Sequence, residues 1–436
     1  MKKSLSVLMV LTILGLFTLT WYCSYLTEQH FTAQVTAINQ VSPELIKVEI
    51  KTYQRKLFTS AAETIIRIRG EEVRFNHQIR HFIWGVKMIT TLVPDSALAK
   101  NIATRIPLEQ LQLTTDFSFL GASKSRLILP SLKFQDNGGS LEITGFSAGW
   151  NLNADLTMGN FVCLLDSLQQ QTDQSELKLA NLRISTQMTD LRDIPLGNGT
   201  LQLEKLQLVG HDKLAIEFQN IQYWGQTDLT QGLFSGTAEL NFDQLLLAGE
   251  TLSDGRLRLT LSGIDMGLLD SIQQTAEQLQ QQAFDQQSSP FELQLQLLAF
   301  YTELLDSGVT LTLEELSLRT DNGEIKGNGD LSLLKESAAE SSLFSLENIT
   351  ANFQLEIDRG AFVTGYRLFS NLQSTGGKHQ NPAVLAEQAE QIAGGLVQKG
   401  IFTRQNGDKF LIDFSWAEGQ GKLNGEVLAS ASLSHQ

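Results

Sequence analysis

The stretch LTLEELSLRTDNGEIKGNG, Leu311 to Gly329, alternates aliphatic and polar residues, breaks at Asp321-Asn322-Gly323, and then alternates again. Alternation with a period of two predicts a β-strand that has one apolar and one polar face. Asn-Gly is favoured in tight hairpin turns because these turns need positive φ angles. The stretch therefore predicts a β-hairpin, and it indicates that antiparallel sheet is the basic element of the fold.

Two similar units occur elsewhere in the chain, and each reads as a strand, a Gly-containing turn and a second strand that ends at Gly. One runs from Phe410 to Gly425 and the other from Ser131 to Gly145. The copies are irregularly spaced and separated by predicted helices, so the chain is not a strict solenoid. The alternative is that any antiparallel sheet protein yields such matches.

The predicted fold class is therefore α+β and rich in strands. We expect long, curved antiparallel sheets, built from hairpin repeats, that pack around a few helices after one N-terminal transmembrane helix. Apolar residues at helical spacing predict a short helix near 160–171, from Phe161, Leu164, Leu165 and Leu168, and longer helices near 264–285, 290–306 and 383–399. The expected parts are an anchor over 1–27, a β-rich domain over 28–262 and a C-terminal domain over 263–436.

The first 25 residues differ from the rest. Met1-Lys2-Lys3 precedes an uncharged, mostly apolar run from Leu5 to about Tyr25, and the first acidic residue is Glu28. About 20 such residues span a bilayer as one helix. The two lysines favour a cytoplasmic N-terminus, which places the chain after Glu28 on the far side of the membrane. The sequence thus predicts a single-pass membrane anchor over residues 5–25.

A cleavable signal peptide is the competing interpretation of this segment. Such a peptide needs small residues at its cleavage site, and FTLTWYCSYL offers no good one. A lipoprotein is disfavoured because the bulky Trp21 and Tyr22 precede Cys23.

The chain has 2 cysteines, Cys23 and Cys163, and a disulfide between them is improbable, since one lies at the membrane boundary and the other in a predicted helix. Few thiols suit an oxidising compartment.

Composition and charge argue against one function class, nucleic-acid binding. Hydrophobic residues make up 42% and charged residues 19% of the chain, which is typical of a folded protein. The formal net charge is −15, and no long basic stripe is present. A nucleic-acid partner is therefore not expected, because phosphate backbones are bound by clustered Lys and Arg.

Gly145-Phe-Ser147-Ala-Gly149 matches G-x-S-x-G, the nucleophile elbow of serine hydrolases. That chemistry needs a sharp turn from a strand into a helix. Here the following residues, Trp150 to Leu156, alternate like another strand, and the chain lacks the βαβα rhythm of a hydrolase. We therefore interpret Gly145 as a turn residue that closes a hairpin.

His77 and His81 have a spacing that would suit a metal site on a helix. Their neighbours alternate instead, and on a strand four residues span ~13 Å, too far for two imidazoles to share one ion. The two histidines are expected to line the inner edge of the sheet, hydrogen-bonded, with a structural or mild pH-sensing role open. No Ca²⁺ loop and no phosphate-binding motif occurs. The sequence predicts no catalytic, cofactor-binding or metal-ligating residue, and hence no enzyme.

With the anchor, the histidine strand and the C-terminal unit taken together, the chain resembles the YdgA-like family of bacterial envelope proteins. That family pairs an N-terminal membrane segment with an early H-x-I-x-H-G-P-like strand, which here reads His77-Gln-Ile79-Arg-His81-Phe-Ile and lacks the Gly-Pro. Its ending, with Leu shortly before Asn-Gly, is matched by Leu423-Asn424-Gly425. The resemblance implies a Gram-negative inner-membrane protein that faces the periplasm, and it brings no catalytic residues.

Two functions remain open at this stage. In the first, the sheet forms a groove that binds a lipid or another hydrophobic ligand, for which the 23 phenylalanines and many leucines supply apolar surface. In the second, the apolar faces close into a dry core, and strand edges or a helix face bind an envelope protein or a second copy in a homo-oligomer. A buried face and a ligand-lined face carry the same sequence pattern, so the sequence does not separate them.

Overall fold

The structure is a computed structural model that divides into two compact units, Met1–Gly199 and Thr200–Gln436, here called the N-terminal and C-terminal units. Its described residues are 18, 20–36, 39, 46–68, 71–82, 84–95, 100, 111–118, 120–129, 131–136, 138–155, 157–190, 196–210, 215–265, 267–268, 308–333, 348–373, 381–406 and 408–428. The sequence suggested a boundary between 262 and 263. That position lies inside strand β15 (Glu250–Asp265), and the contacts divide the chain within β12 (Leu196–Val209) instead.

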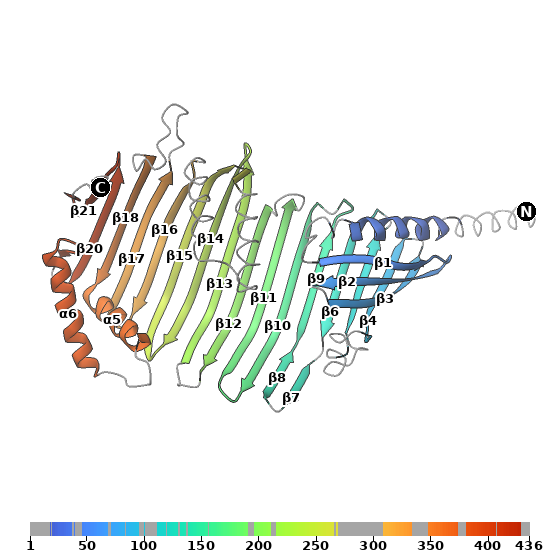
Figure 1. The fold of residues 1–436 in the computed structure, drawn as a ribbon, viewed down its shortest axis with the longest axis horizontal. Coiled ribbons are helices and arrows are strands. Elements are labelled where there is room, and N and C mark those ends of the chain that lie inside the picture. Colours follow the sequence, from blue (N-terminus) through green and yellow to red (C-terminus); the bar gives the residue numbers. More distant parts are fainter. Residues whose placement is uncertain are drawn as a thin grey trace, which may run out of the picture. The chain divides into compact units, whose positions relative to one another are not determined.

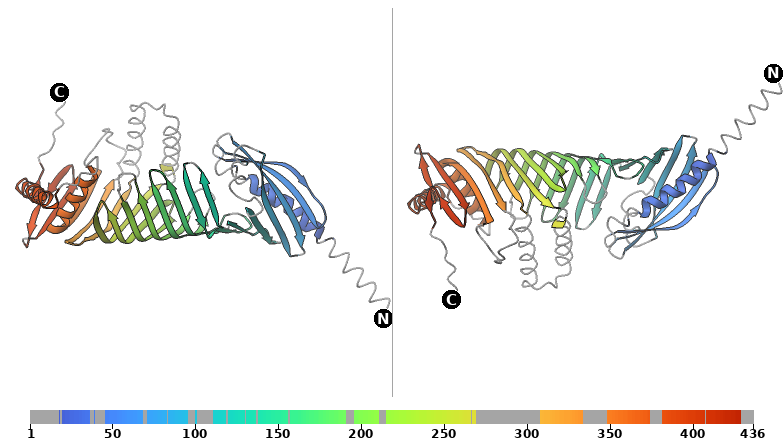
Figure 2. Two further views of the ribbon diagram at one scale, coloured as in Figure 1. Left: turned by 90° about the horizontal axis from the view of Figure 1, so that it is seen from below. Right: turned by 90° about the horizontal axis from the view of Figure 1, so that it is seen from above.

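The N-terminal unit is an antiparallel sheet with one helix, residues 20–36, along one face (Figures 1 and 2). Hydrogen-bonded neighbours follow the order β1, β2, β3, β4, β5, β6, β9, β10, β11, and β7 and β8 form a hairpin whose second strand also pairs with β10. The strands are β1 (Ile46–Gln54), β2 (Thr59–Ile68), β3 (Glu71–Phe82), β4 (Gly85–Val93), β5 (Gln112–Ser118), β6 (Ser123–Leu129), β7 (Leu132–Asp136), β8 (Gly139–Thr144), β9 (Phe146–Leu152), β10 (Gly159–Thr172) and β11 (Glu176–Asp190).

The C-terminal unit is a second stretch of antiparallel sheet that ends beside two helices (Figure 1). Its neighbours follow the order β13, β14, β15, β16, β17, β18, β20, and the free edge of β20 pairs with β19 and β21. The elements are β13 (Ala215–Thr230), β14 (Leu233–Leu247), β16 (Thr310–Thr320), β17 (Gly323–Leu333), β18 (Ile349–Asp358), α5 (Arg359–Gln373), α6 (Pro382–Gln398), β19 (Thr403–Gln405), β20 (Lys409–Ala417), β21 (Gln420–Leu423) and β22 (Glu426–Val427).

The predicted β-rich fold with a large antiparallel sheet and few helices is confirmed. All three hairpin units of the sequence are hairpins in the structure: β16–β17, β20–β21 and β7–β8. The stretch Leu311 to Gly329 turns at Asp321 and Asn322. Gly323 follows with a φ of 145°, a backbone conformation that residues other than Gly rarely adopt. The turn chemistry was therefore a reliable signal.

The short helix predicted near 160–171 is wrong, because these residues form β10. Leu165 is buried and Phe161 is half-buried on one face, whereas Val162 and Leu164 between them are exposed. A run with apolar residues on both faces matches helical spacing as well as strand spacing. Pairing on both edges, with β11 on one side and with β8 and β9 on the other, decides for the strand.

The other helices compare with the sequence as follows. The helix expected near 383–399 corresponds to α6, which Asn381 caps by accepting a hydrogen bond from the Ala383 amide. Residues 269–307, which hold all of the segment 290–306 and most of 264–285, lie outside the described residues. Helix α5 was not expected from the sequence.

The expected anchor over residues 5–25 lies mostly outside the described residues, which begin at 18. Among the helices that the structure describes, none combines the length and the apolar character needed to cross a membrane.

Each unit has its own core. In the N-terminal unit, Phe31 of the helix packs against Ala62, Ile79, Val86, Met88 and Phe117 of the sheet. In the C-terminal unit, Ala361 of α5 and Ala393 of α6 pack against Ile357, Phe402 and Phe410. The helices are thus held by burial of small and aromatic side chains against one sheet face.

Candidate functional site

The sheet of the C-terminal unit has one apolar face that extends across its strands. Tyr223 pairs with Leu240, Leu240 with Leu257, and Leu257 with Leu316. The row continues through Gly327 to Leu355 and Ile412. Because residues two apart on a strand point to the same side, this register places the side chains of the row on one face.

Neighbouring rows repeat the pattern. Leu259 pairs with Leu313, and Leu311 pairs with Leu261 and Leu331. Farther along the face, Phe353 pairs with Phe414 and Ala351 with Trp416. The alternation seen in the sequence therefore produces one continuous apolar surface, here called the apolar face, over strands β13 to β20.

The apolar face is only partly covered. Tyr223 is 42% exposed and Leu240 is 38% exposed, although both lie in the middle of long strands. Over β18 and β20 the same face is covered by α5 and α6, and Ile357 and Phe410 are buried there. Arg367 of α5 forms an ion pair of 2.7 Å with Glu250 of β15, which fixes that helix over the sheet.

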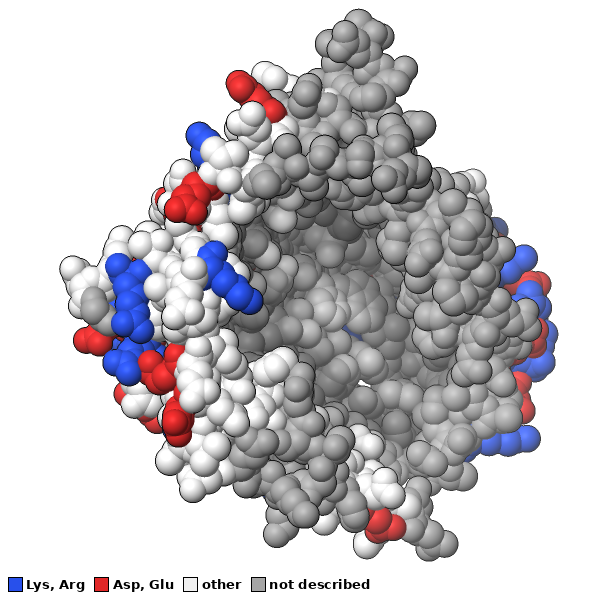
Figure 3. All heavy atoms as spheres, turned by 60° about the vertical axis from the view of Figure 1, so that its left-hand side comes forward, with Lys and Arg blue, Asp and Glu red and all other residues white. Residues whose placement is uncertain are grey.

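The opposite face of this sheet is polar and ion-paired. Arg258 lies 2.9 Å from Glu314, Lys326 lies 2.5 Å from Glu324, and Lys409 pairs with Glu356. Figure 3 shows described acidic and basic side chains intermixed on the outside of the molecule. Because the charged side chains of the opposite face pair with one another, the partly exposed apolar face is the stronger candidate for a binding surface.

The two histidines singled out in the sequence lie on β3, under the helix of the N-terminal unit. Both are buried and on the same sheet face. Nε2 of His77 lies 2.8 Å from Oγ1 of Thr64, and its Nδ1 lies 2.8 Å from Oγ1 of Thr90. Nε2 of His81 lies 2.8 Å from Oγ of Ser60. Burial lowers the pKa of His77 to about 4 and also lowers the pKa of His81.

This arrangement suits a packed polar layer. The rings of Phe31 and His77 form a T-shaped contact with a centroid distance of 5.2 Å, and Ser24 of the helix donates to the Lys56 carbonyl at 3.0 Å. A neutral imidazole supplies one donor and one acceptor, which two hydroxyls complement. Within the part of the chain that the structure describes, no group of three or more His, Cys, Asp or Glu residues could hold a metal ion.

Ser147, the central residue of the G-x-S-x-G match, lies within strand β9. It pairs with Ile128 on one side and Leu164 on the other, so no strand-to-helix turn presents it. Gly145 has a φ of 64° and lies where β8 gives way to β9 along the edge of β10. A Cβ there would overlap the Asp166 side chain, which explains the glycine.

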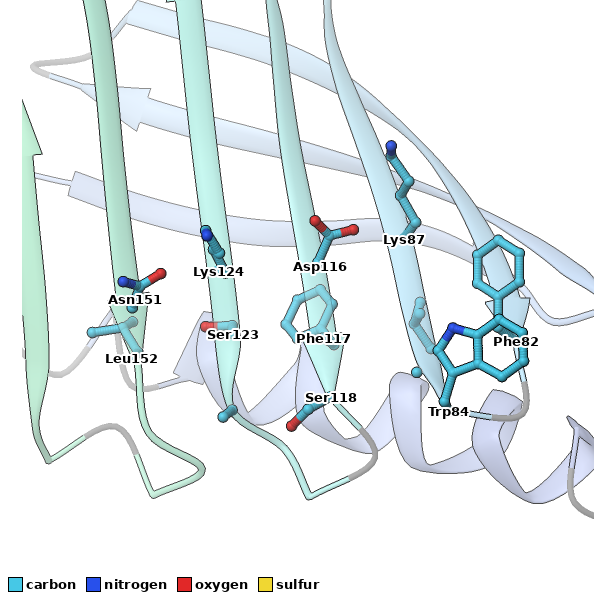
Figure 4. A pocket seen from close by; sticks show the side chains of 13 residues that line it. Phe82, Trp84, Lys87, Asp116, Phe117, Ser118, Ser123, Lys124, Asn151 and Leu152 are labelled. Carbon is cyan, nitrogen blue, oxygen red and sulfur yellow. The ribbon is translucent and has the colours of Figure 1, made fainter.

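A groove of about 540 Å³ lies on the N-terminal unit, on the sheet face away from the helix (Figure 4). Lys87, Asp116, Lys124 and Asn151 occupy paired positions on four neighbouring strands, and the stacked rings of Phe82 and Trp84 border one side. Lys87 and Lys124 form no ion pair within 4.0 Å among the described residues. This groove was not predicted from the sequence. The run Phe82-Ile-Trp84-Gly at a turn was the available signal.

Comparison with known proteins gives one result. Residues 1–429 match a family model described as a bacterial protein of unknown function, DUF945. The chain belongs to this DUF945 family. The match covers nearly the whole chain, in agreement with the expectation of a bacterial protein from a poorly characterised family.

Neither the curated proteins nor the solved structures include a match to this DUF945 protein. The function of this DUF945 member must therefore be argued from its own geometry. Three features of the molecule bear on its function: the partly exposed apolar face, the buried layer of His77 and His81, and the groove that contains Lys87 and Lys124.

Proposed function

We propose that this protein is a non-enzymatic lipid-binding protein of the bacterial envelope, anchored in the inner membrane with its bulk in the periplasm, as the YdgA-like resemblance implies. The apolar face would hold the acyl chain of a lipid or a similar hydrophobic ligand. The observation that carries this proposal is the row Tyr223, Leu240 and Leu257, which is in register across three strands and remains partly exposed.

The driving force would be the removal of acyl chain and apolar face from water. Each buried CH₂ contributes roughly 0.8 kcal/mol. The face is long enough along the strands and across them to contact many such groups, because it includes residues from β13 to β20. A binding site of this kind needs no catalytic side chain, in keeping with the lack of a catalytic motif in the sequence.

The anchor part of the proposal rests on the sequence. Two lysines followed by the uncharged run from Leu5 to Tyr25 suit one membrane-spanning helix with a cytoplasmic N-terminus. Such an anchor would hold the protein at the membrane, which is a source of lipid ligands. The net charge of −15 argues against a nucleic-acid partner.

The test uses photochemical cross-linking of the full-length protein in intact bacterial envelopes. The photoreactive residue p-benzoylphenylalanine replaces Tyr223 on the apolar face, and in the matched control it replaces Gln222. These two neighbours are both exposed and point to opposite faces. Irradiation should add a lipid mass to the protein at position 223 and none at position 222.

The cross-link also separates the two functions. A protein-sized adduct at position 223 would support an envelope scaffold or a self-associating protein whose apolar face binds a partner chain. Equal lipid labelling at 222 and 223 would contradict a specific site, because it would indicate random encounters with the membrane.

A further inference from the structure

Four turns of the N-terminal unit lie together at one end of its sheet. Strand pairing shows which turns lie there: Thr59 pairs with Arg80, Gly85 with Ser118, and Ser123 with Leu152. The turns after β1, β3, β5 and β9 therefore lie at the same end of the sheet. The helix begins there too, because Ser24 bonds to Lys56 of the turn after β1.

Each of these turns exposes a large apolar side chain. Trp84 is 72% exposed and Leu120 is 81% exposed, and Phe58 and Met158 are exposed in the turns on either side. The start of the helix adds Trp21, Tyr22 and Tyr25, all exposed. Trp21 and Tyr25 stack at 6.3 Å, and the Arg55 guanidinium lies 5.8 and 5.7 Å from their ring centroids. These residues are called the aromatic end.

The opposite end of the same sheet is different. Its described turn residues include Asp95, Gly138 and the run Asp173-Gln174-Ser175, all exposed, and no large apolar side chain is exposed among them. Burial in the fold does not explain this asymmetry, because both sets of turns face outward. Exposed Phe, Trp, Leu and Met side chains, one at each of four turns, indicate an apolar environment outside the unit.

The charged residues near the aromatic end indicate which apolar environment it meets. The chain as a whole carries −15, yet four bases, Arg55, Lys56, Lys87 and Lys124, lie at or just behind the aromatic end. Two acids lie beside them, because Glu28 pairs with Arg55 at 3.4 Å and Asp116 stands between the two lysines, so the bases are in excess among these residues. In Figure 4, Lys87 and Lys124 flank Asp116 in the groove that opens beside Trp84. Aromatic side chains at the tip with bases behind them suit the boundary of a bilayer that contains anionic lipids.

The chain outside the described residues agrees with this choice. Residues 1–17, which precede the helix at the aromatic end, are apolar after Lys3 apart from serines and threonines. A membrane segment over residues 5–25 would bring the aromatic end to the bilayer surface directly.

We infer that the aromatic end of the N-terminal unit rests on the bilayer, with Trp84 and Leu120 in the interface and Lys87 and Lys124 facing anionic headgroups. This inference rests on the anchoring part of the proposed function and does not depend on acyl-chain binding by the C-terminal unit. The bilayer contact would fix the orientation of the N-terminal unit at the membrane.

The test is fluorescence quenching by lipids with brominated acyl chains. Full-length protein is reconstituted in vesicles of phosphatidylethanolamine and phosphatidylglycerol, with Trp84 or Trp150 as the sole tryptophan and the others replaced by Phe. Trp150 lies on β9, in the interior of the sheet of the same unit. Trp84 should lose most of its fluorescence in brominated lipid, and Trp150 should lose little.

A second comparison, in the protein that keeps all its tryptophans, leaves the inference falsifiable if tryptophan replacement disturbs folding. Leu120→Asp, at an exposed turn, should reduce the total tryptophan quenching by brominated lipid, whereas Gln174→Asp at the opposite end should leave it unchanged. Equal quenching of Trp84 and Trp150 would overturn the inference. If the protein failed to float with the vesicles, the anchor and this inference would both be rejected, whereas the cross-link at position 223 would report separately on the apolar face.

Discussion

The side-chain amide of Asn424 donates to the backbone carbonyl of Gly400, at 2.8 Å, and so joins the last hairpin to the end of helix α6. The same amide donates to the Ile401 carbonyl at 3.0 Å, and its oxygen accepts from the Asp413 amide at 2.8 Å. Asn424 has a φ of 52°. The Leu-Asn-Gly ending seen in the sequence thus has a structural role, because Asn tolerates this backbone conformation and bonds three segments together.

Asn424→Ala should therefore destabilise the C-terminal unit. Loss of these hydrogen bonds leaves partly buried backbone groups unsatisfied, at a cost of about 1–3 kcal/mol in the free energy of unfolding. Urea unfolding followed by tryptophan fluorescence measures this change. Asn424→Gly is the control, since it keeps the backbone conformation and removes only the side chain. If Asn424→Ala lowered the free energy of unfolding by less than about 0.5 kcal/mol, the range of ordinary surface changes, the role of the amide would be contradicted.

The stability of the N-terminal unit should fall in mild acid because of His77. Its pKa in the folded protein is about 4, below its ordinary value of 6.5, so the unfolded chain binds the proton more tightly. The contribution of His77 is complete above pH 6.5 and is lost as the pH falls toward 4. Between pH 7.5 and pH 5.0 the free energy of unfolding should drop by about 2 kcal/mol.

Urea unfolding curves at several pH values measure this drop. His77→Gln removes the titrating group and keeps hydrogen-bonding capacity toward Thr64 and Thr90, so its stability should depend less on pH. The burial of His81 adds to the effect in the same direction. If wild type and His77→Gln showed parallel pH profiles, the lowered pKa of His77 would be refuted.

The packing of the C-terminal helices on the sheet can be tested with two phenylalanines. Phe410 is 2% exposed and stacks on Phe402 with a centroid distance of 5.1 Å, whereas Phe369 on α5 is 57% exposed. Phe410→Ala should cost about 3–5 kcal/mol of unfolding free energy, because it leaves a cavity in the core. Phe369→Ala should cost under about 0.5 kcal/mol. Similar losses for both variants in chemical denaturation would mean that α5 and α6 pack differently.

Leu240→Asp places a carboxylate in the exposed part of the apolar face. Leu240 is partly exposed, so the fold should tolerate the change, but a bound acyl chain would lose about 1–1.5 kcal/mol of apolar contact, or about five- to tenfold in affinity. The yield of lipid adduct from p-benzoylphenylalanine at position 223 should fall accordingly. The control, Thr312→Asp, changes the polar face. An unchanged adduct yield in Leu240→Asp would show that the lipid does not lie along this row.

Much of the local structure was readable from the sequence. The hairpin around Asp321-Asn322-Gly323 and the strand that carries His77 and His81 follow from alternation and turn chemistry, which a segment of 10–20 residues contains in full. Helix α6 was readable from its apolar stripe and its end at Gly400. Helix α5 was not predicted, because it begins at Arg359 directly after strand β18 ends at Asp358, with no turn residues to mark the change of period.

The candidate sites were much harder to predict. β10 was mistaken for a helix because its apolar residues satisfy both periods, and only pairing on both edges removes the ambiguity. The groove and the aromatic end combine residues from turns that are about 100 positions apart, such as Phe58 and Met158. Their assembly depends on the strand order, which no local pattern contains.

The class of the fold and its hairpins follow from the amino-acid sequence, since each depends on composition or short-range periodicity. Which apolar residues are buried and which stay exposed depends instead on the packing of the folded chain. Tyr223 and Phe410 belong to the same kind of alternating strand, yet one is half-covered and the other lies under two helices. The reason is physical: alternation fixes the face on which a side chain lies, and long-range packing fixes what covers that face.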